Sequence, residues 1–185
     1  VRAELAPASE ALPPAAYRDG AMSPEAEAAD QAALEDMAFL RLPELEPAQR
    51  ARLAVSLRQG QRLAGLDDLL ERAGRAQSAL SDAIGRAAAA TGARPKLTTA
   101  KSRARIEEKV AGKYGGDVSR ITDAVRGGAE VDTPEQAAAF LRELSRSVRV
   151  IDEGWSISPG GYADGKALVV FEDGLLGEVQ LWPPG

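Results

Sequence analysis

The chain has 185 residues, of which 44% are hydrophobic, 28% are charged and 4% are aromatic, and its net charge is −5. This composition predicts one globular domain with room for an appendage, and a core built mainly from Ala, Leu and Val. Cysteine and histidine are both absent, which excludes disulfides, thiolate or imidazole metal ligands, Cys nucleophiles and Ser-His-Asp triads.

Charge is distributed unevenly along the chain. Residues 1–50 hold 4 Lys/Arg against 10 Asp/Glu, whereas residues 101–126 hold 7 against 4. The net charge does not indicate a nucleic-acid-binding surface, but the basic charge is concentrated in one segment. No apolar run approaches the roughly 20 residues that span a membrane, so no membrane partner is expected.

The first half of the chain is rich in Ala and is predicted to be mostly helical. Residues 1–22 contain several prolines and are predicted to be extended or disordered. A Ser-Pro-Glu start predicts a helix over residues 23–40, and apolar spacing predicts a second helix over 46–59 and one or two more over 66–90. Residues 23–95 carry no pattern typical of a catalytic site, so we interpret them as a helical extension that supports the remainder or binds a partner.

A row of cations begins the second half of the chain. Lys101, Arg105 and Lys109 recur every four residues in a helix predicted over residues 98–114. This spacing drifts by only about 40° per step, so the three side chains share one face of the helix. Stacked cations repel one another unless an anion lies opposite them, and a polyphosphate suits such a row. For this pattern alone, a solvated basic face is the plain alternative.

An acidic and a basic residue follow in a short helix predicted over residues 117–127. Asp123 and Arg126 are three residues apart and would share one side of that helix, where a surface ion pair is the plain alternative to a functional role. The next elements are a short strand over residues 129–131, a helix with a capping box over 133–147 and a strand over 148–151.

The end of the chain predicts an antiparallel hairpin. Two apolar strands, residues 166–171 and 175–182, flank an Asp-Gly turn. The strand period of two places Glu178 and Gln180 on one face among apolar neighbours. A carboxylate and an amide in the middle of such a strand indicate either a solvent-exposed face or the floor of a polar site.

Carboxylates are the expected reactive groups of any active site in this chain. Because histidine and cysteine are absent, a general base is expected to be Asp or Glu. A metal is expected to be a hard cation such as Mg²⁺ or Mn²⁺, which takes oxygen ligands.

The order of these motifs resembles the RelA/SpoT-type synthetase domain over about residues 96–182. The matching features are K-x3-R-x3-K on a helix, Asp followed by Arg, Gly-Tyr, and Glu-Val-Gln at the end of a hairpin. Enzymes of this family transfer pyrophosphate from ATP to the ribose 3′-hydroxyl of a nucleotide and thereby make the alarmones (p)ppGpp. The resemblance implies an α+β fold, with a nucleotidyltransferase-like mixed sheet of about four or five strands and flanking helices in residues 96–185. The helical extension would precede this domain.

The resemblance assigns roles to the residues of these motifs. The expected ligands of the ATP phosphates are Lys101, Arg105, Lys109 and Arg126. The expected catalytic and metal-binding carboxylates, which would hold Mg²⁺ or Mn²⁺, are Asp123 and Glu178, and the latter would assist the attacking hydroxyl. The expected acceptor site consists of Tyr162, on which the base would stack, with Asp164 and Gln180 as polar contacts. A carboxylate at residue 164 would favour guanine, which offers two donors on one edge.

The sequence also departs from the family pattern. After Gly-Tyr, the residues Ala163-Asp164-Gly165 stand where the alarmone synthetases usually have Ser and His, and the segment from Asp123 to Arg126 is shorter than usual. Gly-Tyr-x-Asp is more similar to divergent members in bacterial toxins and in phage or secretion-associated proteins. This likeness implies action in the cytoplasm, leaves secretion as an effector open, and suggests an immunity or antitoxin protein as partner. The acceptor stays open between a guanine nucleotide, an adenine nucleotide and the 3′ end of tRNA, and a non-catalytic nucleotide-binding or scaffold module is the remaining alternative.

Overall fold

The computed structural model describes residues 39–161 and 163–184. The extended segment predicted for residues 1–22 lies outside this range, as does nearly all of the helix predicted for residues 23–40. The last two residues of that predicted helix belong instead to a strand, β1 (Phe39–Arg41), so the prediction was wrong at that end. Among the described helices, none is both long and apolar enough to cross a bilayer.

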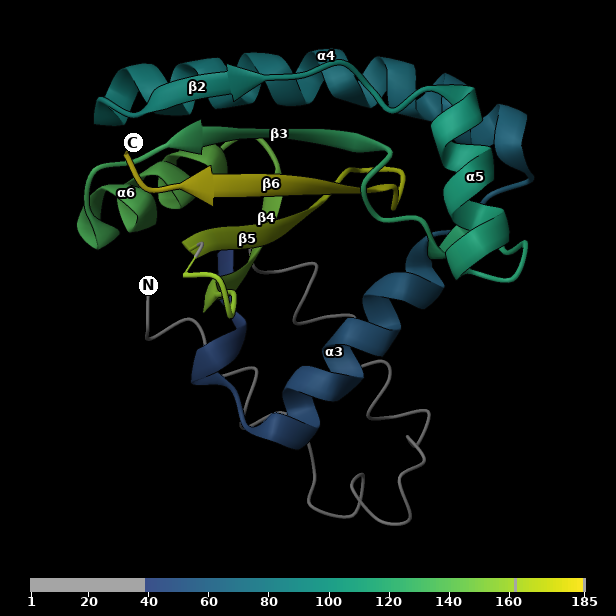
Figure 1. The fold of residues 1–185 in the computed structure, drawn as a ribbon, viewed down its shortest axis with the longest axis horizontal. Coiled ribbons are helices and arrows are strands. Elements are labelled where there is room, and N and C mark those ends of the chain that lie inside the picture. The colour runs from purple at the N-terminus through teal and green to yellow at the C-terminus, as the bar shows by residue number, and fades with distance from the viewer. Residues whose placement is uncertain (1–38, 162, 185) are drawn as a thin grey trace.

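The described residues form a six-stranded mixed sheet with the order β1-β4-β5-β6-β3-β2 (Figure 1). The strands after β1 are β2 (Arg94–Leu97), β3 (Val125–Glu130), β4 (Arg149–Ile157), β5 (Ala163–Val170) and β6 (Leu176–Trp182). The pairs β1–β4 and β3–β6 are parallel, and the other pairs are antiparallel. This sheet with flanking helices confirms the predicted α+β, nucleotidyltransferase-like fold class and the predicted β5–β6 hairpin.

Within the described residues, four helices and two short 3₁₀ turns surround the sheet. They are η2 (Leu42–Glu44), α3 (Pro47–Gly60), α4 (Leu66–Thr91), α5 (Arg103–Lys113), η3 (Val118–Arg120) and α6 (Pro134–Leu144). Helix α6 begins as predicted, because the Thr133 hydroxyl accepts a hydrogen bond from the backbone N–H of Gln136 at 3.0 Å. Helix α4 is a single long helix that ends at Gly92, whose φ of 75° lies in the left-handed region that favours glycine.

The main core lies between one face of the sheet and helices α4 and α6. Leu80 and Ile84 of α4 are 1% and 0% exposed, and Phe140 of α6 is 0% exposed. They pack against the inward-facing residues of β3, β4, β5 and β6, among which Val125 and Val179 are fully buried. Helix α4, which the sequence placed in an extension, therefore shares one hydrophobic core with the sheet.

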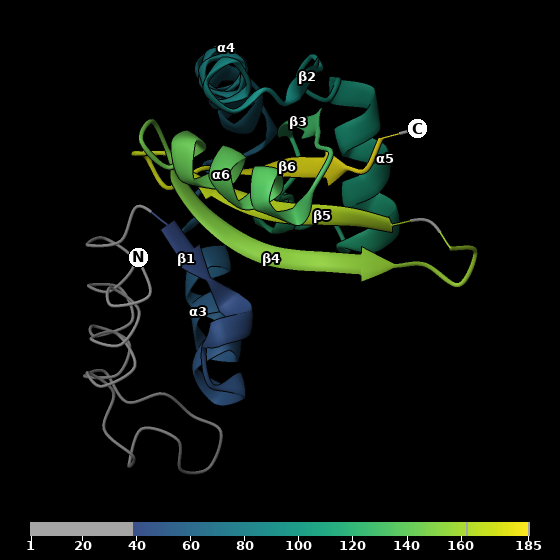
Figure 2. The same cartoon turned by 90° about the vertical axis from the view of Figure 1, so that its left-hand side faces the viewer.

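Helix α3 covers one end of the opposite face of the sheet. Figures 1 and 2 show it on the other side of the strands from α4. Leu53 and Leu57 of α3 pack with Ile151 of β4 and Leu176 of β6 in a second buried cluster. Beyond Leu176 this face of β6 carries polar side chains, beginning with Glu178. The fold thus leaves one polar surface on the sheet next to helix α5.

The prediction of a helix over residues 117–127 was wrong. Only residues 118–120 form a 3₁₀ turn, and Asp123 lies in the extended chain that leads into β3. Gly127 and Gly128 lie inside β3, where the absence of side chains permits close packing. A Cβ at Gly127 would lie 2.6 Å from Ile84 Cδ1, and one at Gly128 would lie 2.0 Å from the backbone oxygen of Gln180.

Candidate active site

Helix α5 is held with one side in the core and the other side facing outwards. Its predicted start at residue 98 or 99 was wrong, because residues 94–97 form β2 and Ser102 is the N-cap. The Ser102 hydroxyl accepts from the backbone N–H of Arg105 at 3.4 Å. Ile106 and Val110, which are 0% and 7% exposed, fix the inner side of the helix in the main core. Arg105 and Lys109 therefore lie on another side of the helix, and Lys101 lies just before its N-cap.

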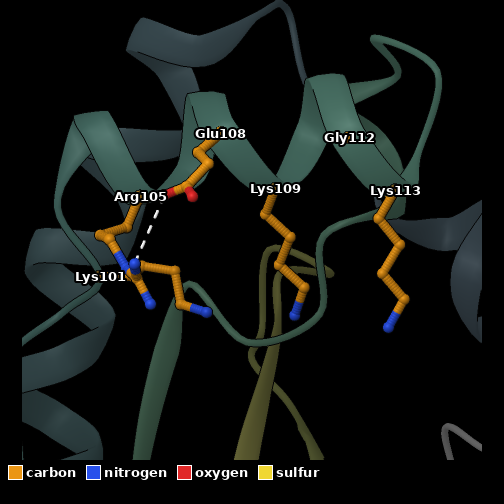
Figure 3. A pocket seen from close by; sticks show the side chains of 6 residues that line it. All are labelled: Lys101, Arg105, Glu108, Lys109, Gly112 and Lys113. Carbon is orange, nitrogen blue, oxygen red and sulfur yellow. Dashed lines mark hydrogen bonds and ion pairs between the residues drawn. The ribbon is translucent and has the colours of Figure 1, made fainter.

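Four cations of this row point to the same side of α5 (Figure 3). Together with Glu108 and Gly112 they line an open hollow of about 360 Å³: Lys101, Arg105, Lys109 and Lys113. The sequence reasoning missed Lys113, although the same four-residue spacing would have identified it. The row is thus one residue longer than predicted.

Asp123 joins two of these cations. Its Oδ2 accepts hydrogen bonds from Lys101 Nζ at 2.8 Å and from Lys109 Nζ at 2.7 Å. All three side chains are largely buried, at 16%, 12% and 26% exposure respectively. Burial opposes the charge of Asp123, but the hydrogen bonds from the two lysines outweigh it and lower its pKa. The structure therefore brings together three of the predicted site residues.

Glu178 lies on β6, the strand next to β3, and its charge affects the pKa of Lys109. Burial opposes the charge of Lys109, but the hydrogen bond to Asp123 outweighs it, and the negative charge of Glu178 adds to the increase of the Lys109 pKa. Arg126 of β3 and Glu178 of β6 are directly opposite each other in the parallel ladder, so their side chains share the polar face of the sheet. Lys109 is thus a common neighbour of both predicted catalytic carboxylates.

Arg105 and Arg126 differ from the two lysines. Arg105 is 74% exposed and pairs with Glu108 on its own helix at 3.4 Å, as Figure 3 shows. Arg126 is also exposed. Neither arginine belongs to the buried group around Asp123, and their binding of a phosphate stays a prediction.

The predicted acceptor residues have a separate environment. Tyr162 lies outside the described residues. Asp164 is 7% exposed, and its two oxygens accept hydrogen bonds from Gln180 Nε2 at 2.7 Å and from Ser156 Oγ at 3.2 Å. The structure therefore brings Asp164 and Gln180 together, but it places the carboxylate among protein donors. A contact between Asp164 and a base edge would require these bonds to open.

A divalent cation fits this site only if part of its ligand shell comes from a substrate. Among the described residues, no group of three or more acidic side chains could hold a metal. The Oδ1 atom of Asp123 is buried and has no hydrogen-bond partner. Such an orphaned carboxylate oxygen is costly unless it gains a partner, so it suits one bond to a hard cation. Asp123 and Glu178 would then hold the cation together with phosphate oxygens and water.

Comparisons with known proteins show the fold alone. No protein-family model and no curated protein matches the sequence. Among solved structures, the fold is similar to a chain in the crystal structure of the complex between the Type VI effector Tas1 and its immunity protein. The TM-score is 0.55 and the sequences are 24% identical over 67% of this chain and 64% of that chain. The match thus spans less than two thirds of the neighbour.

Arg126 is held by a residue that the sequence reasoning missed. Gln77 of α4 accepts from the backbone N–H of Arg126 at 3.0 Å and donates to its carbonyl oxygen at 2.8 Å. Strand β2 pairs with β3 only from Gly127 onwards, so the glutamine supplies the hydrogen bonds that a neighbouring strand would otherwise make. The two residues are 49 positions apart, and no local sequence signal connects them.

Proposed function

We propose that this chain is an ATP-dependent pyrophosphokinase that transfers pyrophosphate from ATP to the 3′-hydroxyl of a nucleotide. The observation that carries the proposal is the pairing of Asp123 with Lys101 and Lys109, beside Glu178. Two cations that meet on one carboxylate, with a second carboxylate on the strand next to β3, suit the transfer of a phosphate group. The order of the motifs supports the same reaction class, and the fold that the chain shares with a chain in the Tas1 complex is compatible with it.

For this reaction the protein mainly has to position the two substrates and neutralise the charge of the phosphates. A bond forms between the acceptor 3′ oxygen and the β-phosphorus of ATP, and the bond from that phosphorus to the α–β bridging oxygen breaks. AMP leaves, and the hydroxyl proton passes to a base. Because the transition state is loose, most of the rate enhancement is expected from orientation and from cations near the phosphate oxygens.

Lys101 and Lys109 are the proposed ligands of those phosphate oxygens. Their ammonium groups converge on one oxygen of Asp123 at 2.7–2.8 Å, the usual length of a charge-assisted hydrogen bond. A phosphate oxygen is also an anionic acceptor, and each ammonium group has three N–H donors, so the two lysines can donate to phosphate while they stay bonded to Asp123 Oδ2. The four-residue spacing would extend the contact along the triphosphate to Arg105.

Glu178 is the proposed base, and Asp123 is the proposed first ligand of the metal. The carboxylate of Glu178 stands on the polar face of β6 and is only partly buried, so it is accessible to a substrate hydroxyl. Oδ1 of Asp123, which has no hydrogen-bond partner, would bind the metal, while Oδ2 keeps its hydrogen bonds with the two lysines. A bound Mg²⁺ or Mn²⁺ would supply additional neutralisation of phosphate charge.

The test is product analysis with the full chain. Incubation with ATP, Mg²⁺ and separate acceptors (ADP, GDP and tRNA) should release AMP and form an acceptor that carries one added pyrophosphate, which mass spectrometry can identify. Glu178→Gln should abolish this product while it keeps the fold, because it removes the charge and preserves the shape. Glu172→Gln, which makes the same change in the exposed β5–β6 turn, is the matched control. Absence of AMP with every acceptor would contradict the proposal.

We further infer that the enzyme acts as a toxic effector and is neutralised by an immunity protein. The support is the fold that it shares with a chain of an effector–immunity complex. Expression of the chain in bacterial cytoplasm, where ATP and nucleotides are present, should stop growth. Glu178→Gln should remove the toxicity at equal protein level, and equal toxicity of this variant would contradict an enzymatic effect.

A further inference from the structure

The side chain of Gln61 connects two segments that carry the predicted catalytic carboxylates. It follows the last residue of α3 and is 2% exposed. Its Nε2 donates to the carbonyl oxygens of Ser119, at 2.7 Å, and Ile121. Its Oε1 accepts from the backbone N–H of Leu176 at 2.9 Å. Both amide hydrogens and the amide oxygen therefore have partners.

These contacts lie close to both carboxylates. Ile121 is two residues before Asp123, and Leu176 is two residues before Glu178. The β3–β6 ladder begins at the pair formed by Val125 and Gly177, so no ladder pair joins the two segments at Ile121 and Leu176. The Gln61 amide bridges the segments just beyond the end of the ladder. One buried side chain therefore adds a connection between the two segments at this end of the sheet.

We propose that Gln61 is a positioning residue that sets the separation of Asp123 and Glu178 and thereby the affinity for a divalent cation bound with ATP. The inference rests on the proposed function, which assigns these two carboxylates to the metal. Within the described residues, the hydrogen bonds of the Gln61 side chain go to backbone groups. A purely structural role would lower the stability of the protein but would leave the affinity of the folded site unchanged.

The test measures binding, which does not require turnover. The probe is Mn²⁺ with α,β-methylene-ATP, in which the bridge that the reaction would break is a methylene group. Electron paramagnetic resonance of Mn²⁺ gives the dissociation constant for the full chain. The variant Gln61→Met keeps the length of the side chain and removes all three hydrogen bonds.

Gln136→Met is the matched control. Gln136 also bonds to backbone on both sides, since it accepts from Asp132 N–H at 2.6 Å and donates to Thr91 O at 3.0 Å. It lies beyond the far end of β3 from Asp123. Both variants should melt at a lower temperature than the wild type, but only Gln61→Met should weaken binding of the probe. We expect a loss of about 10- to 100-fold, the range typical of residues that hold metal ligands in place.

A folded Gln61→Met protein that binds the probe as tightly as wild type would overturn the inference. If Gln61→Met does not fold, Gln61→Glu keeps the size and the acceptor for Leu176 but loses the donors to Ser119 and Ile121. It should show the same weakening, and wild-type affinity in this variant would overturn the inference equally. A wild-type chain that neither binds the probe nor releases AMP from ATP would instead contradict the proposed function.

Discussion

Asp123 has two oxygens in different states, and this difference determines what the site can bind. Oδ2 accepts two ammonium hydrogen bonds, whereas Oδ1 is buried without a partner. An exposed ion pair usually contributes about 0–1 kcal/mol, but the group around Asp123 is largely shielded from water and is expected to contribute more. Removal of the carboxylate should therefore affect both the stability of the fold and the binding of a nucleotide.

Asp123→Asn should lower the free energy of unfolding by about 1.5–3 kcal/mol at pH 7, the usual contribution of a hydrogen bond to a charged group. Burial opposes both charges, yet the pKa of Asp123 is lowered and that of Lys109 is raised. The contribution of Asp123 is therefore present above its unfolded pKa of about 4 and is lost as the pH falls through the lowered value. The contribution of Lys109 is lost only as the pH rises through a value above 10.5.

Urea unfolding between pH 2 and 8 checks this dependence. The difference between wild type and Asp123→Asn should be largest near neutral pH and should decrease as the pH falls below about 4. A difference that stays constant over the whole range would show that the carboxylate charge does not stabilise the fold.

Lys113 extends the basic row and forms no ion pair with the described residues. Lys101 and Lys109 share Asp123, and Arg105 pairs with Glu108, so Lys113 is the cation of the hollow that is most available to an anion. Lys113→Gln should weaken binding of α,β-methylene-ATP by up to about fivefold, since an exposed charge contributes up to about 1 kcal/mol. Titration calorimetry measures this change.

Lys96→Gln is the control for Lys113→Gln. It removes the same charge from β2, where Lys96 lies over the Trp182 ring at 4.9 Å. Equal effects of the two variants would indicate that only the net charge of the protein matters. A specific effect of Lys113→Gln would assign this residue to the phosphate site.

At the scale of elements, the sequence predicted what is determined locally. The Thr133 N-cap, the Asp-Gly hairpin turn and the four-residue spacing of Lys101, Arg105 and Lys109 each depend on residues close together in the chain, and all three features are present in the structure. Strand β3 was predicted only at its end, as a short strand over residues 129–131. Its sequence, VRGGAE, lacks an apolar alternation, and its strand conformation depends on pairing with β6 and on close packing under α4.

The unpredicted parts of the site have the same origin. The environment of Asp164 is set by Ser156 and Gln180, which reach it from two neighbouring strands. The backbone contacts of Gln61 and Gln77 span 58 and 49 positions or more along the chain. A glutamine in a helix or just after one carries no sequence signal for such contacts, so only the tertiary structure reveals them.

The glycines of β3 give a test at the scale of this element. Gly128→Ala should destabilise the protein by about 1–3 kcal/mol, because its Cβ would lie 2.0 Å from the backbone oxygen of Gln180 and 2.6 Å from the Trp182 ring. Gly85→Ala in α4 is the matched control, because its Cβ would meet nothing within 4 Å. It should stabilise the helix by about 0.5–1 kcal/mol. Chemical denaturation of both variants measures these changes. An unchanged free energy of unfolding in Gly128→Ala would contradict the close packing at β3.

For the whole molecule, helices α3 and α4, which lie between β1 and β2 in the chain, support the site as well as the core. Gln77 of α4 forms hydrogen bonds with the backbone of Arg126. Gln61, the residue after α3, forms hydrogen bonds with the segments before Asp123 and Glu178. The sequence showed no catalytic pattern in this half, because its contribution consists of packing and backbone contacts. The helical half and the motif-bearing half are therefore expected to fold as one unit.

We expect residues 96–185 alone not to fold cooperatively. Without α4 the sheet would lose the cover formed by Leu69, Leu80 and Ile84, which are 0–1% exposed. Burial of three such side chains contributes roughly 5–9 kcal/mol, which is comparable with the total stability of a typical domain, about 5–15 kcal/mol. Circular dichroism should show a cooperative thermal transition for the full chain and none for residues 96–185.

Addition of a peptide of residues 61–95 should restore the transition, because the peptide contains α4 and Gln61. The same peptide with Leu80→Asp and Ile84→Asp is the control and should not restore it, since both side chains are buried in the main core. A cooperative transition of residues 96–185 near the melting temperature of the full chain would instead show that the boundary predicted at residue 95 also separates two folding units. Helix α4 would then cover a sheet that is already stable, and the effect of Gln77 on Arg126 would be confined to the site.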